Sequence, residues 1–438
     1  MERPRHRRPA RQQLPAPPPG VQTENWRHRL WGPVIGFGLV SLAADMVSDG
    51  ARPLGGPLLA QLGASALFVG LVTGAAEAAS QGLRLVFGPW ADRTGKYWTF
   101  TMAGYVLTAV CIPLLALTPF AGTAGMALAA MLIIGDRVGK AVRSPAKTVL
   151  LAAVAGPVGR GRGFAVHKSL DLAGALLGPL LVSAVLVATG SLSAAFAVLV
   201  IPAAAAVAIL VWLRRRVRDP GADKPAPDAS GVPEPSRWKP AGRPPSAFSS
   251  VFILFAVAAF FWSAGLVAFG VISYHLTTDV AVPVSVVPLL YAGAMGTAAV
   301  GALASGVIYD RAGAAVLLAL PVLIMAVPVL ALAPSAGLVF AGVLVWGAAT
   351  GIQDSTVKAL VADLVPQPRQ GTAYGVFAAF EGAGALAGGA LYGSLYGARP
   401  ALIAAVAALQ ATALVLLFVT LHRVRHASPG HGPADGRS

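Results

Sequence analysis

Charged residues are scarce in this chain of 438 residues, where Asp, Glu, Lys and Arg together make up 12%. That is about half the share usual for soluble proteins, and too little to cover the surface of soluble domains. The composition therefore excludes a soluble globular enzyme, and a hydrophobic content of 56% excludes a disordered protein. The chain has a single cysteine, Cys111, which excludes an intrachain disulfide framework and any multi-cysteine metal site.

Acidic residues are fewer than basic ones, with 18 Asp and Glu against 33 Lys and Arg, and the net charge is +15. Nucleic-acid-binding proteins gather their basic residues on one soluble face. Here the basic residues crowd into the N-terminal stretch and into the segment from Arg214 to Arg243, with long apolar stretches between them. This pattern argues against a nucleic-acid partner and is typical of a multi-pass membrane protein.

Long apolar runs provide the expected membrane spans, each of which needs about 20 mostly apolar residues. Turn signals and charges divide the chain into twelve such segments. In the first half they are expected at residues 30–60, 66–90, 97–118, 123–147, 162–188 and 193–213. In the second half they are expected at residues 247–275, 284–309, 314–333, 337–365, 371–396 and 399–421. If the N-terminus is cytoplasmic, nearly all Lys and Arg outside the spans are cytoplasmic, and only Arg399 lies on the opposite side.

The two halves of the chain repeat each other. The sequence Gly88-Pro-Trp-Ala-Asp-Arg-Thr-Gly95 is matched by Gly306-Val-Ile-Tyr-Asp-Arg-Ala-Gly313, 218 residues later. The same offset relates two further pairs, Asp136 with Asp354 and Lys140 with Lys358. Two separate sites that share one offset indicate a tandem duplication of six helices, related by an axis along the membrane normal.

We therefore expect an all-α membrane protein with twelve transmembrane helices in two six-helix bundles. The expected parts are a disordered basic cytoplasmic tail at 1–29, an N-terminal bundle at 30–213, a cytoplasmic linker at 214–246, a C-terminal bundle at 247–421 and a cytoplasmic tail at 422–438. Both termini are expected to be cytoplasmic.

The repeated loop carries a family resemblance. The pattern G-x-x-x-D-R-x-G-[KR], between the second and third spans and again between the eighth and ninth, resembles the signature loop of the major facilitator superfamily. The first copy is complete through Lys96, whereas the second has Ala314 where a basic residue is usual. The resemblance implies alternating access around a central cavity and a conformational latch at each loop. The latch residues are Gly88, Asp92, Arg93, Gly95, Lys96, Gly306, Asp310, Arg311 and Gly313.

The fourth span holds a second, partial match. Its sequence is similar to the family pattern R-x-x-Q-G, with Arg137 as the arginine and with Lys140 and Ala141 in place of the glutamine and glycine. In the family this pattern has a role in proton transfer. The two replacements put that role in doubt for this chain. Asp136 and Lys140 lie one turn apart and are expected to pair, which leaves Arg137 without a partner on its own face.

The fifth span contains Gly174, Gly178 and Pro179, which match the G-x-x-x-G-P core of a motif of drug–proton antiporters. The resemblance favours an efflux role. The same small residues also serve tight helix packing in any membrane bundle, and proline bends the helix.

Carboxylates in the spans are the candidates for proton coupling, because charges in the membrane are costly and mark functional sites. Asp45, Asp49 and Arg52 fall on one face of the first helix, where the two carboxyl groups are expected to titrate as a unit or to bind a cation. Glu77 and Glu381 have no basic neighbour one turn away and favour their neutral form. For Asp45 and Asp49 the alternative is a structural network with Arg52 and Arg84. For Glu77 and Glu381 it is a neutral carboxyl group hydrogen-bonded to a neighbouring helix.

The sequence predicts a secondary transporter that moves a small organic molecule and protons across a bacterial plasma membrane, by proton-coupled efflux through antiport. One alternative is a proton-coupled importer of an organic anion that is held by Arg52, Arg137 and Lys140. The other is a receptor or scaffold without transport. The sequence contains no G-x-x-x-x-G-K-[ST], H-E-x-x-H or G-x-S-x-G pattern, so we expect neither ATP drive nor enzymatic activity. No cofactor or metal is expected, and we expect a monomer.

Overall fold

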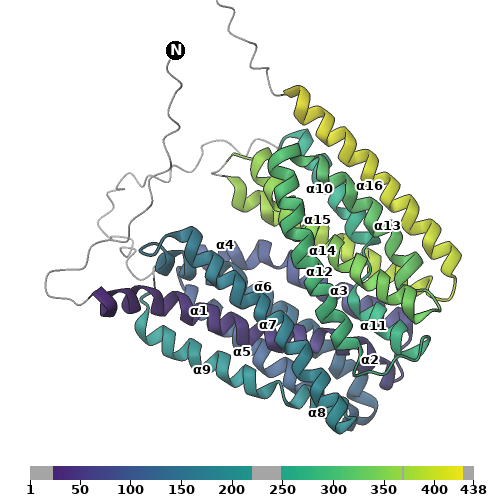
Figure 1. Ribbon diagram of the computed structural model, residues 1–438, viewed down its shortest axis with the longest axis horizontal. Coiled ribbons are helices and arrows are strands. Elements are labelled where there is room, and N and C mark those ends of the chain that lie inside the picture. Colours follow the sequence, from purple (N-terminus) through teal and green to yellow (C-terminus); the bar gives the residue numbers. More distant parts are fainter. Residues whose placement is uncertain (1–22, 220–247, 367–368, 428–438) are drawn as a thin grey trace, which may run out of the picture.

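The computed structural model describes residues 23–219, 248–366 and 369–427, and in these ranges the regular structure is helical throughout (Figure 1). The predicted tails and linker lie partly outside these ranges. The first helix begins at Thr23, six residues before the predicted end of the N-terminal tail, and the last ends at Ala427, beyond the predicted start of the C-terminal tail at 422.

The first half of the chain consists of nine α-helices and three short 3-10 helices. They are α1 (Thr23–Ala51), η1 (Arg52–Leu54), α2 (Gly55–Gln61), α3 (Ala66–Gly82), α4 (Arg84–Thr94), α5 (Tyr97–Leu114), η2 (Leu115–Phe120), η3 (Gly122–Ala124), α6 (Gly125–Ala155), α7 (Arg160–Thr189), α8 (Leu192–Ala197) and α9 (Val200–Arg216).

The second half follows the same plan with fewer interruptions. Its elements are α10 (Ser250–Gly265), α11 (Phe269–Thr278), α12 (Val287–Ala312), η4 (Gly313–Leu318), α13 (Ala319–Ala331), α14 (Ala336–Leu364), α15 (Gln370–Ser394) and α16 (Arg399–Ala427).

Consecutive elements join into twelve spans, which confirms the all-α fold predicted from the sequence. Nine stretches of the described residues are long and apolar enough to cross a membrane, and one of them, Val287–Ala331, contains two spans, α12 and α13. The remaining two spans are α6 and α15. Helix α6 is less apolar because it contains Asp136, Arg137, Lys140, Arg143 and Lys147, and α15 is rich in glycine.

The interruptions within spans have local causes. The first span breaks at η1 because Pro53 and Pro57 weaken the backbone hydrogen bonding of a helix. Gly95 ends α4 with φ of 65°, and Gly313 ends α12 with φ of 68°, a region that favours glycine. Both copies of the repeated loop therefore end a helix at a glycine with positive φ.

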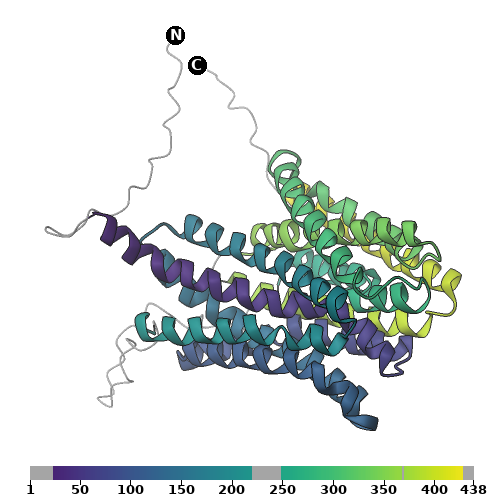
Figure 2. The ribbon, with the colours of Figure 1, turned by 60° about the horizontal axis from the view of Figure 1, so that its bottom comes forward.

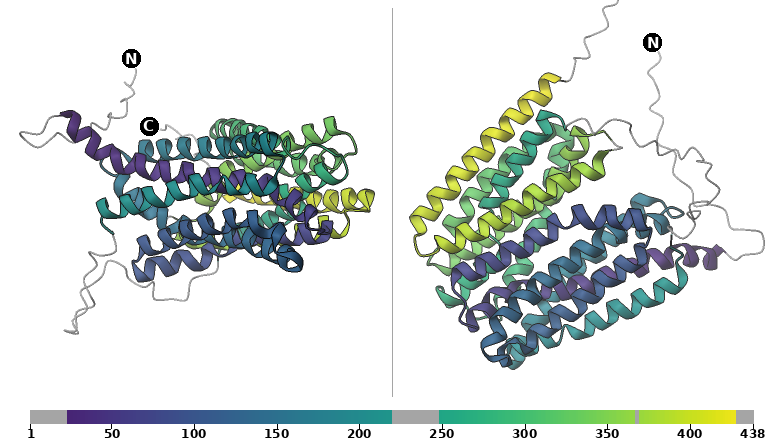
Figure 3. Two further views of the ribbon diagram at one scale, coloured as in Figure 1. Left: turned by 90° about the horizontal axis from the view of Figure 1, so that it is seen from below. Right: turned by 180° about the vertical axis from the view of Figure 1, so that it is seen from behind.

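Each half forms one bundle, and the two bundles lie side by side (Figure 2). We call the end where α9 stops and α10 starts the linker end, and the opposite end, where α2 and α7 stop, the far end. The bundles converge toward the far end and diverge toward the linker end, as Figure 1 and the right panel of Figure 3 show.

Contacts between the halves hold the far end together. Helix α3 packs on α15, α2 on α11, and α7 on α12. The α3–α15 contact is so close that a Cβ atom on Gly70 would lie 2.2 Å from the carbonyl oxygen of Gly389. At the far end, Ser183 Oγ of α7 donates a 2.6 Å hydrogen bond to the carbonyl oxygen of Ser285, just before α12. The largest apolar core includes residues of both halves, such as Leu58 and Tyr291.

Candidate functional site

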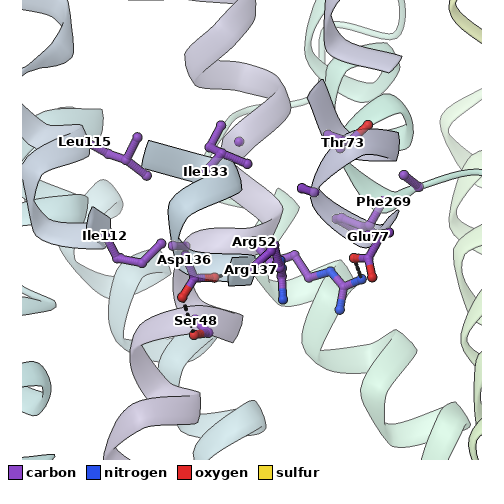
Figure 4. A pocket seen from close by; sticks show the side chains of 15 residues that line it. Ser48, Arg52, Thr73, Glu77, Ile112, Leu115, Ile133, Asp136, Arg137 and Phe269 are labelled. Carbon is purple, nitrogen blue, oxygen red and sulfur yellow. Dashed lines mark hydrogen bonds and ion pairs between the residues drawn. The ribbon is translucent and has the colours of Figure 1, made fainter. Parts of the chain in front are cut away.

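A small cavity lies where the first four spans and the seventh span meet (Figure 4). Its volume is about 40 Å³, which is room for about three water molecules. Organic ligands need pockets of roughly 300 Å³ or more, so the cavity is contracted around its own side chains in this arrangement. The charged and polar residues that line it are Ser48, Arg52, Thr73, Glu77, Asp136 and Arg137.

An ion pair between Arg52 and Glu77 forms one side of this cavity. Nη2 of Arg52, at the end of the first helix, donates to Oε1 of Glu77, in the middle of α3 (Figure 4). The two side chains are 24% and 25% exposed. Glu77 therefore has a basic partner on another helix, and the expectation that it is an isolated acid is wrong.

Asp136 and Arg137 form the opposite side of the cavity. Ser48 Oγ of α1 donates a 3.0 Å hydrogen bond to Asp136 Oδ1, and Arg137 Nε lies 3.8 Å from Asp136 Oδ2. Both side chains are almost completely buried. Asp136 thus compensates the charge of Arg137, its neighbour in sequence. The expectation that Arg137 has no partner on its own face is therefore wrong. With Glu77 and Arg52, the four charges around the cavity sum to zero.

The two carboxyl groups of the first helix point to different partners. Asp49 Oδ1 accepts a 2.9 Å hydrogen bond from the hydroxyl of Tyr291 in α12. Asp45 interacts electrostatically with Asp171 of α7 instead. The predicted Asp45–Asp49 pair is therefore divided between a contact inside the first half and a contact across the two halves.

Glu381 lies outside the cavity, in α15 of the second half. Its Oε1 accepts a 2.8 Å hydrogen bond from Nε2 of Gln353 in α14. Arg84, at the start of α4, interacts electrostatically with Glu381 and with Asp354. The first half thus presents a cation to two acids of the second half.

Several charged side chains in the middle of spans are exposed toward the linker end. Lys168 and Lys358 are 65% and 60% exposed, and Asp354 is 70% exposed. Lys168 of the first half interacts electrostatically with Asp354 of the second half. Asp354 pairs with Lys358 at 3.4 Å, whereas its repeat counterpart Asp136 is buried beside Ser48.

The latch residues lie at the linker ends of α4 and α12. Asp92, Arg93, Asp310 and Arg311 are exposed. Asp92 Oδ1 accepts a 3.1 Å hydrogen bond from the hydroxyl of Tyr97. Neither loop is part of the cavity, and the two loops lie in different halves.

The glycines of the fifth span face the first helix. A Cβ atom on Gly174 would lie 2.3 Å from the carbonyl oxygen of Leu42, and one on Gly178 would lie 2.3 Å from that of Met46. The two residues therefore let the backbones of α1 and α7 approach closely, and Pro179 follows them inside α7.

A second cavity, of about 220 Å³, lies at the far end. Its lining residues are His275, Asp279, Leu332, Pro334, Tyr396 and Arg399. His275 Nε2 lies 2.9 Å from the carbonyl oxygen of Ala333, and Tyr396 donates a 2.5 Å hydrogen bond to Asp279. All of these residues belong to the second half, so this cavity does not lie between the bundles.

Some residues of these sites were absent from the prediction. Two of them, Ser48 and Gln353, have polar side chains, and Tyr291 has an aromatic ring. Side chains of these kinds occur throughout membrane helices, and nothing in the spacing of the three residues marks them. Asp171 is a further membrane carboxylate, and it pairs with Lys168 three residues earlier in the same helix.

Comparison with known proteins agrees with this architecture. A family model described as Major Facilitator Superfamily matches residues 37–277 and 251–437. Uncharacterized proteins of Mycobacterium tuberculosis and Mycobacterium bovis are 47% identical over 398 residues, which covers 90% of this chain and 94% of each relative.

Solved structures share the fold at low sequence identity. The nucleoside transporter NupG has a TM-score of 0.63 at 14% identity, over 90% of this chain and 99% of that one. A peptide transporter POT in complex with sulfate has a TM-score of 0.67 at 14% identity, over 90% and 94% of the two chains. A D-xylose-proton symporter has a TM-score of 0.61 at 12% identity, over 88% and 95%. These likenesses concern the fold alone.

Proposed function

Because this chain belongs to the major facilitator superfamily, we propose that it is a proton-coupled transporter of a small organic anion, with the Arg52–Glu77 ion pair as its coupling site. Membership makes the chain a multi-pass membrane transporter rather than an enzyme. Its mycobacterial relatives indicate that it is a bacterial protein.

The charge state of the cavity carries the proposal. Arg52 and Arg137 each have a carboxylate beside them, Glu77 and Asp136, so the cavity has no free positive charge for an anion. When Glu77 takes up a proton, its charge disappears and Arg52 is left uncompensated in a poorly hydrated place. An anion that binds Arg52 restores neutrality, so proton and anion bind together.

A cation has no comparable binding site in this cavity. Binding a cation to Glu77 or Asp136 requires that it displace an arginine already in place, which leaves a buried guanidinium unpaired. The ion pairing therefore favours symport of an anion over antiport of a cation, and favours the second of the functions expected from the sequence.

Efflux by antiport is the second candidate, and the observation in its favour is the glycine-proline sequence of the fifth span. In that mechanism the proton and the substrate bind alternately rather than together. The two candidates thus differ in whether substrate binding takes up or releases a proton.

We assign the linker end to the cytoplasm because Lys and Arg are concentrated in the loops at that end. We propose the plasma membrane as the location of the chain and a monomer as its state. The Ser183–Ser285 contact between the halves then lies on the external side, and the exposed charges of Lys168, Asp354 and Lys358 face the cytoplasm. Rocking of the two bundles exposes the cavity to each side in turn.

The test uses purified protein in liposomes with a pH-sensitive dye inside. Panels of monocarboxylates, organic phosphates and organic cations are added outside without a proton gradient. A carboxylate or phosphate that acidifies the lumen only with the protein present supports symport. If an organic cation added outside makes the lumen more alkaline, this result supports antiport instead and overturns the anion proposal.

Variants then locate the coupling site. Glu77→Gln is expected to keep anion exchange while losing the proton signal, because a neutral side chain at 77 mimics permanent protonation. Asp363→Asn, at an exposed position outside the cavity and the latch motifs, serves as the control and is expected to keep proton coupling. If Glu77→Gln keeps full proton coupling, Glu77 is not the coupling residue.

A further inference from the structure

The second cavity, at the far end, is larger than the central one. It measures about 220 Å³ against about 40 Å³, and three connections of the second half meet there. They are the segment after α11, the turn between α13 and α14, and the turn between α15 and α16. Pockets for drug-sized ligands begin at roughly 300 Å³, so this cavity has room for a smaller molecule.

His275 lies in this cavity between hydrogen-bond partners that all accept. Its Nε2 lies 2.9 Å from the carbonyl oxygen of Ala333, so this nitrogen carries a proton. Its Nδ1 lies 2.8 Å from the hydroxyl oxygen of Tyr396 and 3.0 Å from Asp279 Oδ2. Tyr396 donates its single proton to Asp279 at 2.5 Å, so Nδ1 also faces acceptors. The arrangement therefore satisfies these groups when His275 is the doubly protonated imidazolium.

The charge of the cavity follows the protonation of His275, because histidine gains or loses its charge near physiological pH. The other titratable or charged groups around it are Tyr274 and Asp279 of its own segment and Tyr396 and Arg399 of the turn before α16. Elements α2, α3, α14 and η1 also pack on α11. Their charged residues lie elsewhere, at the central cavity or toward the linker end: Arg52, Glu77, Asp354, Lys358 and Asp363.

Arg399 supplies a second cation to this cavity. Its Nη2 donates a 2.8 Å hydrogen bond to the carbonyl oxygen of Val329, and none of the ion pairs among the described residues includes it. The acid that shares the cavity, Asp279, already accepts from His275 and Tyr396 through Oδ2. Arg399 is also the first residue of α16, where the positive end of the helix dipole adds to its charge.

We propose that this cavity is an external binding site for a small carboxylate or phosphate anion, which binds together with a proton on His275. With His275 charged, the lining carries two cations and one anion, and a bound anion at Arg399 restores neutrality. The proton comes from external water and binds Nδ1. A cationic ligand would add to the positive charge, and one histidine with one aspartate provides too few ligands for a zinc ion.

Loss of the proton rearranges this cluster. Tyr396 then turns its hydroxyl toward Nδ1 of His275, and Asp279 Oδ2 loses both of its donors. The Asp279 side chain is 47% exposed and lines the same cavity as Arg399, so it can then balance the charge of that arginine. Anion binding therefore weakens as the pH rises, and a bound anion in turn favours the protonated form of His275.

The site deepens the proposed function, and it rests on that function for the external location of the far end and for the transported anion as its ligand. All of its lining residues belong to the second half, so the cavity persists while the two halves are in contact at the far end. It can therefore collect an anion and a proton outside before the central cavity opens to that side.

The test is protection of a cysteine at the cavity. Pro334→Cys, in a Cys111→Ser background, places a thiol at an exposed position of the lining. The full-length protein in phosphatidylcholine liposomes is labelled from outside with an impermeant maleimide, at about pH 5.5 and at about pH 8. Acetate and inorganic phosphate are the probes, and chloride at equal ionic strength is the reference at each pH. We expect a saturating probe to slow labelling roughly ten-fold at the acidic pH and to have little effect at the alkaline pH.

Thr123→Cys in the same background is the matched control. Residue 123 is exposed at the far end of the first half and lies outside the cavity, so neither probe is expected to change its labelling. Arg399→Gln in the Pro334→Cys protein is expected to remove protection at both pH values, and Arg399→Lys is expected to keep part of it. His275→Gln is expected to remove the difference between the two pH values.

Three results would overturn the proposal. In the first, Pro334→Cys is protected equally at both pH values or Thr123→Cys is protected as well, which requires no change of a charged residue. In the second, protection survives in Arg399→Gln. In the third, phosphatidylglycerol in the liposomes protects the thiol before any soluble anion is added, which identifies a lipid phosphate as the occupant.

Failure here is distinguishable from failure of the proposed function. Labelling requires no transport, and Glu77→Gln, at the central cavity, is expected to leave the protection unchanged. Absence of protection with normal proton-coupled anion uptake overturns the external site alone. Acid-dependent protection without any proton signal during anion uptake overturns the symport alone.

Discussion

The hydroxyl of Tyr291 donates a 2.9 Å hydrogen bond to Oδ1 of Asp49, and this bond joins the two halves of the transporter. Tyr291 is fully buried and Asp49 is 7% exposed. The bond lies among the contacts that hold the far end together, close to where Ser183 meets the backbone of Ser285. It is therefore a contact that must break when the far end opens.

We expect Tyr291→Phe to shift the protein toward the arrangement in which the far end is open. A hydrogen bond to a charged acceptor contributes about 1.5–3 kcal/mol, and its loss corresponds to a shift of roughly ten-fold or more in the equilibrium. The measurement is the labelling rate of Ser183→Cys by a membrane-impermeant maleimide in a Cys111→Ser background, because Ser183 is 3% exposed in the present arrangement.

Tyr392→Phe is the matched control for this experiment. Tyr392 is also fully buried and donates a 2.7 Å hydrogen bond, but to the carbonyl oxygen of Gly265 within the second half. Removing that hydroxyl changes no contact between halves. Equal labelling rates in the two variants would contradict a role for Asp49–Tyr291 in closing the far end.

The helices could be predicted from the sequence because length and apolar content decide whether a segment spans a membrane. The predicted span at 162–188, for example, corresponds to α7 at Arg160–Thr189. Charges and glycines reduced the apolar signal of α6 and α15 without preventing their assignment, since the repeat and the alternation of basic loops supported both. The start of α1 at Thr23 was missed because its polar first turns lack apolar periodicity.

The partners of Asp45, Asp49 and Glu77 could not be predicted, because they lie on other helices. Asp45 and Asp49 are one turn apart and looked like a pair, yet tertiary packing turns one toward α7 and the other toward α12. Glu77 looked isolated because its partner Arg52 lies 25 residues away on a different span. Spacing within a helix identifies a shared face, whereas the neighbour of that face depends on how the bundle packs.

The Arg52–Glu77 pair also predicts how the stability of the folded protein changes when one or both of its side chains are replaced. Arg52→Met leaves the Glu77 carboxylate without its cation, and we expect a loss of about 1–3 kcal/mol, less than for a fully buried pair because both side chains are about one quarter exposed. The double variant Arg52→Met with Glu77→Gln is expected to recover most of the loss. Thermal unfolding of the purified protein measures this recovery.

Lys358→Met is the control for the pair, since Lys358 and Asp354 are 60% and 70% exposed and such pairs contribute little. Its unfolding temperature is expected to stay near that of the unchanged protein. If the single and double variants of Arg52 and Glu77 lose stability additively, the two side chains are not energetically coupled.

The two loop copies should differ in strength as latches. If the latch stabilises the arrangement with the linker end closed, Asp92→Asn disfavours that arrangement and slows the labelling of Ser183→Cys. A loss of about 1 kcal/mol corresponds to roughly a five-fold change in rate. Asp310→Asn should have a smaller effect because Ala314 replaces the basic residue that ends the first copy. If Asp310→Asn has an equal or larger effect, the basic residue that ends the first copy is not important for the strength of the latch.

The close approach of α1 and α7 predicts opposite effects for two glycine substitutions in the same helix. In Gly174→Ala the added Cβ atom would lie 2.3 Å from the backbone oxygen of Leu42, so the helices must separate, at a cost of about 1–3 kcal/mol. In Gly161→Ala nothing lies within 4 Å, and alanine is expected to stabilise α7 by up to about 1 kcal/mol. Unfolding temperatures of the two variants should therefore move in opposite directions. A rise of similar size in both would mean that helix propensity at these positions, rather than the contact with Leu42, determines the stability of α7.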